Sequence, residues 1–228
     1  MEEIMHVLPQ DIEAESFRII GEELSAKGVK IAKELEPIVK RVIHTTADFE
    51  YADTLYFSCG VVDTIINAFL SGKAVIVTDT TMALSGINKT AAKKLGVETH
   101  CFIADEDVAN SAKEQGITRS AASVQKMWRM FKGSDKQVIF VNGNAPTASI
   151  ELCEILEKEN FQKNRDVLPL KAALCVPVGF VNVVYAKDLI CSIENLSVIA
   201  NKGRKGGSNV AASIVNALLY LSIKKEKY

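Results

Sequence analysis

The hydrophobic and polar positions follow two alternating patterns from about residue 55 onward. Short, nearly continuous apolar segments rich in β-branched residues predict strands that are covered on both faces. These segments are 55–58, 74–78, 97–103, 137–142, 172–176 and 197–201. Between them, apolar residues at helical spacing predict helices that include 61–70, 120–131, 146–159 and 209–223. The alternation predicts an α/β fold, with a doubly wound, mainly parallel sheet and helices on both faces.

The first fifty residues have a different pattern. It predicts two amphipathic helices, at about 11–27 and 37–48, separated by Gly28 and Pro37. The sequence contains no repeat, low-complexity tract or linker, and 228 residues suffice for one core. We therefore expect a single domain over 1–228, in which 1–50 form a helical segment packed on or near the functional site.

Composition narrows the class of protein. Lys and Arg total 27 against 28 Asp and Glu, and this balance gives no reason to expect nucleic acid or a membrane as partner. No apolar run approaches the ~18 residues that span a bilayer, and the amino terminus does not resemble a signal peptide. The five scattered cysteines, without CxxC spacing, indicate reduced thiols. We expect a cytoplasmic protein without a structural metal.

The segment after strand 137–142 could bind an anion. In open α/β sheets, ligands lie beyond the carboxyl ends of the strands, where the topology changes direction. Gly143 permits a turn there, Asn144 could cap the next helix, and Pro146 suits its first position. The first amides of that helix would then point at the ligand. An ordinary connection between strand and helix explains the same residues.

A glycine-rich, basic loop follows strand 197–201. Gly203, Gly206 and Gly207 would let backbone amides turn inward as an anion nest, and Arg204 adds positive charge. Ser208 is placed as the N-cap of the last helix. A flexible linker with exposed basic residues is the alternative. The glycine spacing does not match Gly-x-Gly-x-x-Gly, so a dinucleotide is not indicated.

His44 is the best candidate for acid–base chemistry, because histidine exchanges a proton near neutral pH. Lys40 and Asp48 lie four residues to either side and would share its helix face. Asp48 and the helix carboxyl end would favour the imidazolium, and Lys40 would oppose it. A surface histidine in a local ion pair is the alternative. His6, near the terminus, and His100, expected to pack in a strand, are weaker candidates.

Two arginines complete the candidate site. Arg119, at the start of a predicted helix, and Arg18 could each clamp a carboxylate with the planar guanidinium. A surface ion pair is the alternative for both. No pair of histidines has the spacing of metal ligands.

Six segments together resemble the precorrin-8X methylmutases, in the order of that family and over about residues 11 to 222. They are Ser16-Phe17, Lys40-Arg41-Val42-Ile43-His44-Thr45-Thr46-Ala47-Asp48-Phe49, Thr118-Arg119-Ser120-Ala121-Ala122, Gly143-Asn144-Ala145-Pro146-Thr147-Ala148, Val176-Pro177-Val178-Gly179-Phe180-Val181 and Gly203-Arg204-Lys205-Gly206-Gly207-Ser208. One departure is Val184-Tyr185-Ala186-Lys187, where family members often carry Glu-Ser-Lys.

The resemblance implies a flavodoxin-like sheet and an isomerase of cobalamin biosynthesis. Such an enzyme moves a methyl group from carbon 11 to carbon 12 of precorrin-8 or cobalt-precorrin-8, giving hydrogenobyrinate or cobyrinate. It also implies that His44 is the catalytic proton donor and that a homodimer shares its active sites. The His-Thr-Thr-Ala-Asp version of the motif is closer to the cobalt-containing branch. No cofactor or protein metal is implied, because cobalt would arrive in the substrate.

We expect the contacts with the substrate, including its acetate and propionate groups, to come from the same segments. The expected substrate-binding residues are Ser16, Phe17, Arg18, Lys40, Thr45, Thr46, Asp48, Arg119, Asn144, Ala145, Thr147, Gly203, Arg204, Gly206, Gly207 and Ser208. Two alternatives use the same loops. One is a non-catalytic tetrapyrrole carrier, and the other is a nucleotide or phosphate-ester site that would need Asp79 as a Mg²⁺ ligand.

Overall fold

A computed structural model describes residue 8 and residues 11–226, so His6 lies outside the described part. Six strands form one sheet in the order β1-β6-β5-β4-β2-β3. Their bounds are β1 Leu55–Phe57, β2 Ala74–Thr78, β3 Glu98–His100, β4 Gln137–Asn142, β5 Leu170–Cys175 and β6 Ser197–Asn201. All neighbouring pairs are parallel except β1 with β6. Without β1 this is the flavodoxin-like order, as predicted.

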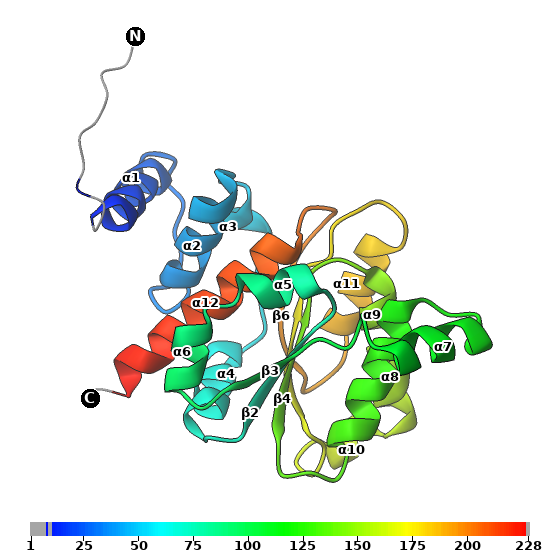
Figure 1. Ribbon diagram of the computed structural model, residues 1–228. Helices are drawn as coiled ribbons and strands as arrows, with labels where there is room; N and C mark the ends of the chain where they lie inside the picture. The colour runs from blue at the N-terminus through cyan, green and yellow to red at the C-terminus, as the bar shows by residue number, and fades with distance from the viewer. Residues whose placement is uncertain (1–7, 9–10, 227–228) are drawn as a thin grey trace.

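Helices cover both faces of the sheet (Figure 1). On one side lie α1 Ile12–Ala26, α2 Glu36–Thr46, α3 Tyr51–Thr54, α4 Val61–Leu70, α5 Thr81–Gly86, α6 Lys89–Lys94 and α12 Ser208–Lys225. On the other lie α7 Glu106–Gln115, α8 Arg119–Phe131, α9 Pro146–Lys158, α10 Phe161–Asn164 and α11 Val183–Cys191. Because successive strand residues face opposite ways, Ile76 joins one core while Val75 and Val77 join the other. The prediction of a doubly covered sheet is confirmed.

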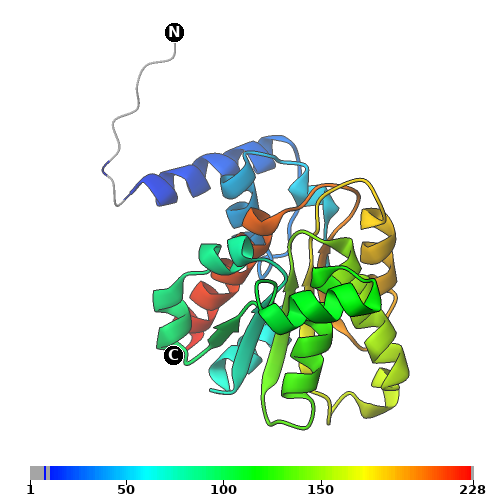
Figure 2. The ribbon, with the colours of Figure 1, turned by 45° about the vertical axis from the view of Figure 1, so that its right-hand side comes forward.

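The amino-terminal helices belong to the first of these two cores. Ile20 and Leu24 of α1 and Ile38 and Ile43 of α2 are buried in the same cluster as the inner residues of α12. Figure 2 shows α1 and α2 lying over the helical layer rather than apart from it. The helix predicted over 37–48 ends earlier, at Thr46, because Ala47 adopts a left-handed conformation with φ 53°.

The remaining differences concern short elements. The strand predicted over 97–103 is limited to Glu98–His100, at one edge of the sheet. Six observed helices, α3, α5, α6, α7, α10 and α11, were not among those predicted. Among the described helices, none is both long enough and apolar enough to cross a membrane.

Two strands define where a ligand site is expected. The chain leaves β2 toward β3 on one side, and β4, β5 and β6 follow on the other, so the direction changes between β2 and β4. The carboxyl ends of β2, β4, β5 and β6 lie near the top of the sheet in Figure 1, where α5 and α12 begin. This edge is the expected ligand side of the fold.

Candidate functional site

A buried aspartate organises the point where the topology changes direction. Asp79, which follows β2 and is 1% exposed, accepts hydrogen bonds from the backbone amides of Gly143 (2.8 Å), Asn144 (2.8 Å) and Ala145 (3.1 Å). The Nδ2 of Asn142 donates a fourth, at 2.7 Å. Burial raises the pKa of Asp79, and these four donors oppose the rise.

These hydrogen bonds correct two expectations. The amides of residues 143–145, expected to face a ligand, donate to Asp79 instead. The N-cap of α9 is Ala145, not Asn144, because Asp79 supplies the acceptor that a capping side chain would provide. A carboxylate that accepts four protein hydrogen bonds holds the turn in place, and it is poorly placed as the Mg²⁺ ligand of a nucleotide site.

Helix α12 begins beside the turn that Asp79 holds. Its N-cap is Gly207, and Ser208 is its first residue, so the prediction of Ser208 as N-cap was wrong. The Ser208 hydroxyl instead hydrogen-bonds that of Thr80 at 2.9 Å, which ties the helix to the end of β2. Gly143 is needed here for close approach, because a Cβ on it would lie 2.9 Å from the Cα of Ser208.

The glycine-rich loop, residues 202–207, is held from inside by a buried lysine. The Nζ of Lys187, on α11, donates to the carbonyl oxygens of Gly203 (2.8 Å) and Lys205 (2.7 Å). Lys187 is 2% exposed, and burial lowers its pKa to about 8. The Nδ2 of Asn201 donates a further bond to the Lys205 carbonyl at 2.9 Å. The loop backbone is therefore fixed, while the side chain of Arg204 is exposed.

The same loop packs on the turn that follows β5. The amide of Gly207 donates to the Val176 carbonyl at 2.8 Å. A Cβ on Gly206, whose φ is 159°, would lie 2.1 Å from that carbonyl oxygen, so no other residue fits there. The two connections thus form one packed double loop at the carboxyl ends of β5 and β6.

His44 lies exposed in the last turn of α2. Its ring meets the Phe17 ring of α1 edge to face, with centroids 5.6 Å apart. Lys40 and His44 share a face of α2 as expected, but Asp48 does not, because α2 ends at Thr46. The Lys40 ammonium pairs instead with Glu36 at 2.5 Å.

The other polar residues of these two helices make local hydrogen bonds. The hydroxyls of Thr45 and Thr46 donate to backbone carbonyls one turn earlier, at 2.9 Å and 2.8 Å. The hydroxyl of Ser16, on α1, does the same to the Ile12 carbonyl at 2.9 Å. Their roles in substrate binding stay predictions.

An ion pair joins the histidine segment to the glycine-rich loop. The Nζ of Lys205 donates to the carboxylates of Asp48 and Glu50, the latter at 2.6 Å. These contacts lower the pKa of Asp48. The Thr54 hydroxyl also donates to Asn201 Oδ1 at 2.7 Å. Residues 147 to 157 positions apart in sequence are thereby brought together, as the candidate site requires.

Arg119 and Thr147 mark the opposite side of the candidate site. The Thr118 hydroxyl, which caps α8, hydrogen-bonds the Thr147 hydroxyl of α9 at 2.8 Å, so the two helix starts lie side by side. Arg119 is exposed and makes no ion pair or side-chain hydrogen bond to any described residue. Arg18 is different, because Glu15 and Glu22 of its own helix pair with its guanidinium. This pairing is the surface ion pair that the sequence allowed as the alternative for Arg18.

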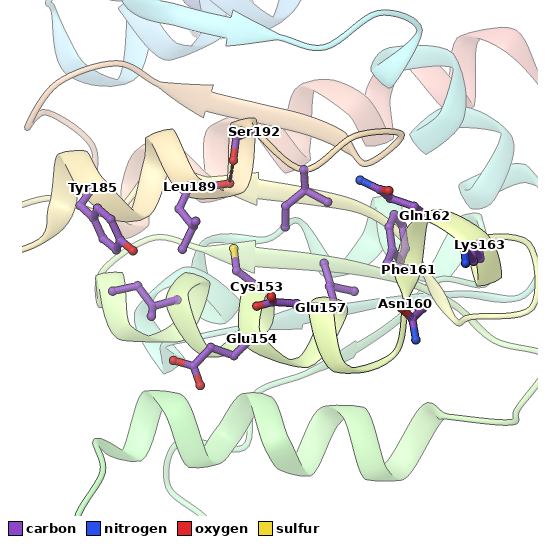
Figure 3. Close-up of a pocket in the computed structure, with 13 residues that line it drawn as sticks. Cys153, Glu154, Glu157, Asn160, Phe161, Gln162, Lys163, Tyr185, Leu189 and Ser192 are labelled. Carbon is purple, nitrogen blue, oxygen red and sulfur yellow. Dashed lines mark hydrogen bonds between the residues drawn. The ribbon is translucent and has the colours of Figure 1, made fainter.

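Two cavities beside the amino-terminal helices are lined in part by expected substrate-binding residues: Phe17 borders one of about 650 Å³, and Lys40 borders one of about 450 Å³. A third, of about 500 Å³, runs between α9, α10 and α11 (Figure 3) and contains none of the predicted site residues. Its Cys153 thiol is not a reactive group, because burial raises its pKa to about 12. By contrast His44, Arg119, Asn144 and Arg204 are all exposed. The candidate site is therefore an open surface along the carboxyl edge of the sheet.

Sequence reasoning missed the residues that support this surface. Asp79 was considered only as a metal ligand, and Lys187 and Asn201 were not assigned to the site. A polar residue directly after a buried strand, as with Asp79, is one signal that could have indicated such a role. For Lys187 the signal was its match to the lysine of the family's Glu-Ser-Lys, and on α11 it shares the buried face of Val183, Ala186 and Ile190.

Comparison with known proteins gives a consistent result. Residues 11–221 match the family described as CbiC, precorrin-8X methylmutase. The cobalt-precorrin-8 methylmutase of Salmonella typhimurium is 43% identical over 221 residues, which cover 95% of this chain and 98% of that protein. That of Leptospira interrogans is 39% identical over 225 residues, 96% of each chain. A solved precorrin-8x methyl mutase from Thermus thermophilus superposes with a TM-score of 0.79 at 33% identity, covering 94% of this chain and 98% of that one.

Proposed function

Because the chain belongs to the precorrin-8X methylmutase family and is an isomerase of cobalamin biosynthesis, we propose that it moves a methyl group from carbon 11 to carbon 12 of cobalt-precorrin-8. The product is cobyrinate. The observation that carries the proposal is the match over 95% of the chain to a relative named cobalt-precorrin-8 methylmutase. The alternative of a non-catalytic carrier is not favoured, because these relatives are named as enzymes.

The reaction is an internal rearrangement. The bond between carbon 11 and the methyl group breaks, the bond to carbon 12 forms, and no electron is gained from or lost to another molecule. We expect no cofactor, with cobalt entering only as part of the substrate. The protein's task is then to orient the ring and to stabilise the charge that shifts during migration.

His44 is the proposed proton donor. Three observations support it: the imidazole is exposed, it lies at the carboxyl end of a helix, and the Lys205 ion pair ties the following segment to the glycine-rich loop. A proton or strong hydrogen bond from His44 to the macrocycle would draw electron density as the methyl group moves, and after a full proton transfer the ring releases one proton again, because substrate and product are isomers.

The test is turnover of cobalt-precorrin-8, followed anaerobically by the visible spectrum. His44→Ala should lower kcat by roughly 10²–10⁴-fold, the usual share of general acid catalysis, while cobyrinate still binds. The control is His100→Ala, which removes an imidazole that stacks on Phe102 and should leave kcat near that of the wild type. Normal turnover by His44→Ala would refute the assignment.

The choice between cobalt-containing and metal-free substrate is tested separately. We propose cobalt-precorrin-8 because the relatives from Salmonella typhimurium and Leptospira interrogans both carry that substrate in their names. The wild-type protein should convert cobalt-precorrin-8 with a higher kcat/KM than precorrin-8. The reverse order would overturn this part of the proposal.

We further propose a cytoplasmic homodimer whose subunits share their active sites. The open shape of the candidate site supports a shared site, because four of its expected residues are exposed in the single chain. Sedimentation should give twice the chain mass of 24.9 kDa. The test of sharing is a mixed dimer of one His44→Ala subunit and one Arg119→Ala subunit. If each site takes His44 from one chain and Arg119 from the other, one of the two sites keeps both native residues and should be active. If each site lies within one chain, neither site keeps both.

A further inference from the structure

An exposed apolar turn follows β5, beside the glycine-rich loop. Val178, Phe180 and Val181 are 46%, 81% and 77% exposed. Large apolar side chains clustered in water mark a surface that binds something, whereas single ones are ordinary. The sequence assigned no role to this turn.

The backbone beneath these side chains is fixed. The amide of Gly179 donates to the Arg204 carbonyl at 3.2 Å, and Gly206 packs directly under the carbonyl of Val176. Lys187 holds the other side of the same double loop. The turn is thus held by the glycine-rich loop, and its apolar side chains are presented on a preorganised support.

A cation stands next to the exposed ring. The Arg204 guanidinium carbon lies 5.3 Å from the centre of the Phe180 ring. The pair offers an aromatic surface and a carboxylate-binding group side by side, at the carboxyl edge of the sheet. A conjugated macrocycle with acetate and propionate groups at its rim has the complementary arrangement.

We propose that Phe180 and Val181 form a binding surface for the apolar face of the corrinoid, next to which Arg204 takes one of its carboxylates. This inference rests on the proposed function and adds Phe180 and Val181 to its site. Covering Phe180 removes from water an aromatic side chain that is 81% exposed, which favours binding. Phe180 and Val181 should affect the binding of the substrate and not its chemical conversion, because neither side chain can exchange a proton with it.

The experiment measures binding of cobyrinate to the purified full chain by visible absorption. Phe180→Ala should weaken binding by about ten-fold, and Phe180→Tyr, which keeps the ring, should bind nearly as well as the wild type. Added salt should leave the effect of Phe180→Ala unchanged. The effect of Arg204→Ala should shrink as salt rises, because that contact is between charges.

A matched control separates the turn from surface effects. Val181→Ala should weaken binding several-fold, while Val167→Ala, the same change at an equally exposed valine after α10, should not. Unchanged affinity of Phe180→Ala for cobyrinate overturns the inference. Weaker binding that is explained by dissociation of the dimer, as sedimentation of the same variant would show, overturns it too. Failure of the wild type to bind cobyrinate or turn over substrate would instead count against the proposed function.

Discussion

Replacing Asp79 tests whether the switch point of the sheet is organised as described. Asp79→Asn keeps one acceptor oxygen, which can stay on the side where Asn142, Asn144 and Ala145 donate. Its new NH₂ group then faces the buried amide of Gly143, which loses its acceptor. An unsatisfied buried donor costs about 1–3 kcal/mol, so we expect a loss of that size in the free energy of unfolding.

Asp79→Ala should cost more, roughly 2–4 kcal/mol, because all four donors lose their acceptor and only the exposed ones can bond to water. The assay is urea unfolding, with the midpoint falling and the m-value unchanged. The control is Asp135→Asn, which removes an exposed ion pair with Lys73 and should cost less than 1 kcal/mol. Surface substitutions usually change the free energy of unfolding by no more than about 0.5 kcal/mol, so an Asp79→Asn protein within that range of the wild type would refute the reasoning.

Three further predictions concern charged groups of the candidate site. The pKa of Lys187 is about 8 in the folded protein and 10.5 in its ordinary state, so between these pH values the unfolded chain holds a proton that the folded protein has lost. The free energy of unfolding of the wild type should therefore rise from pH 8 to 10.5 by about 1–3 kcal/mol relative to Lys187→Met, as measured by urea titrations. Lys205→Met removes the ion pairs with Asp48 and Glu50, and it should lower the free energy of unfolding by less than about 1 kcal/mol but raise KM several-fold. An unchanged KM would show that this ion pair does not contribute to substrate binding. Arg119→Ala should weaken cobyrinate binding and flatten its dependence on salt, and a salt dependence equal to that of the wild type would remove Arg119 from the site.

The fold could be read from the sequence because its main signals are long and periodic. Strands β2, β4 and β6 coincide with the predicted segments, since each is a buried apolar run that ends at a polar residue. Six short helices were missed because four to ten residues carry little periodicity, whereas α4, also ten residues long, was predicted because seven of its residues are apolar. The early end of α2 depends on the left-handed conformation of Ala47, which alanine does not favour and which its sequence therefore does not predict.

The candidate site was predicted less completely than the fold. Sequence pattern singled out the segments around Asn144 and Arg204, because glycines and a helix start coincide there, and it singled out His44 by the chemistry of its side chain. It could not find which backbone groups are already bonded: Asp79 occupies the amides that seemed free, and it reaches them across 64 residues of sequence. Long-range partners of this kind are set by tertiary packing, and local spacing carries no trace of them.

The sheet has a further property that follows from its two ends. Its outermost strands, β1 and β3, are three residues long, so each leaves few unpaired backbone groups facing outward. On β3 the ion pair of Glu98 with Lys136 adds charge to that border. Long, uncharged borders invite neighbouring chains to add strands and precipitate. This protein should therefore tolerate high concentration during production without fibril growth from its folded state.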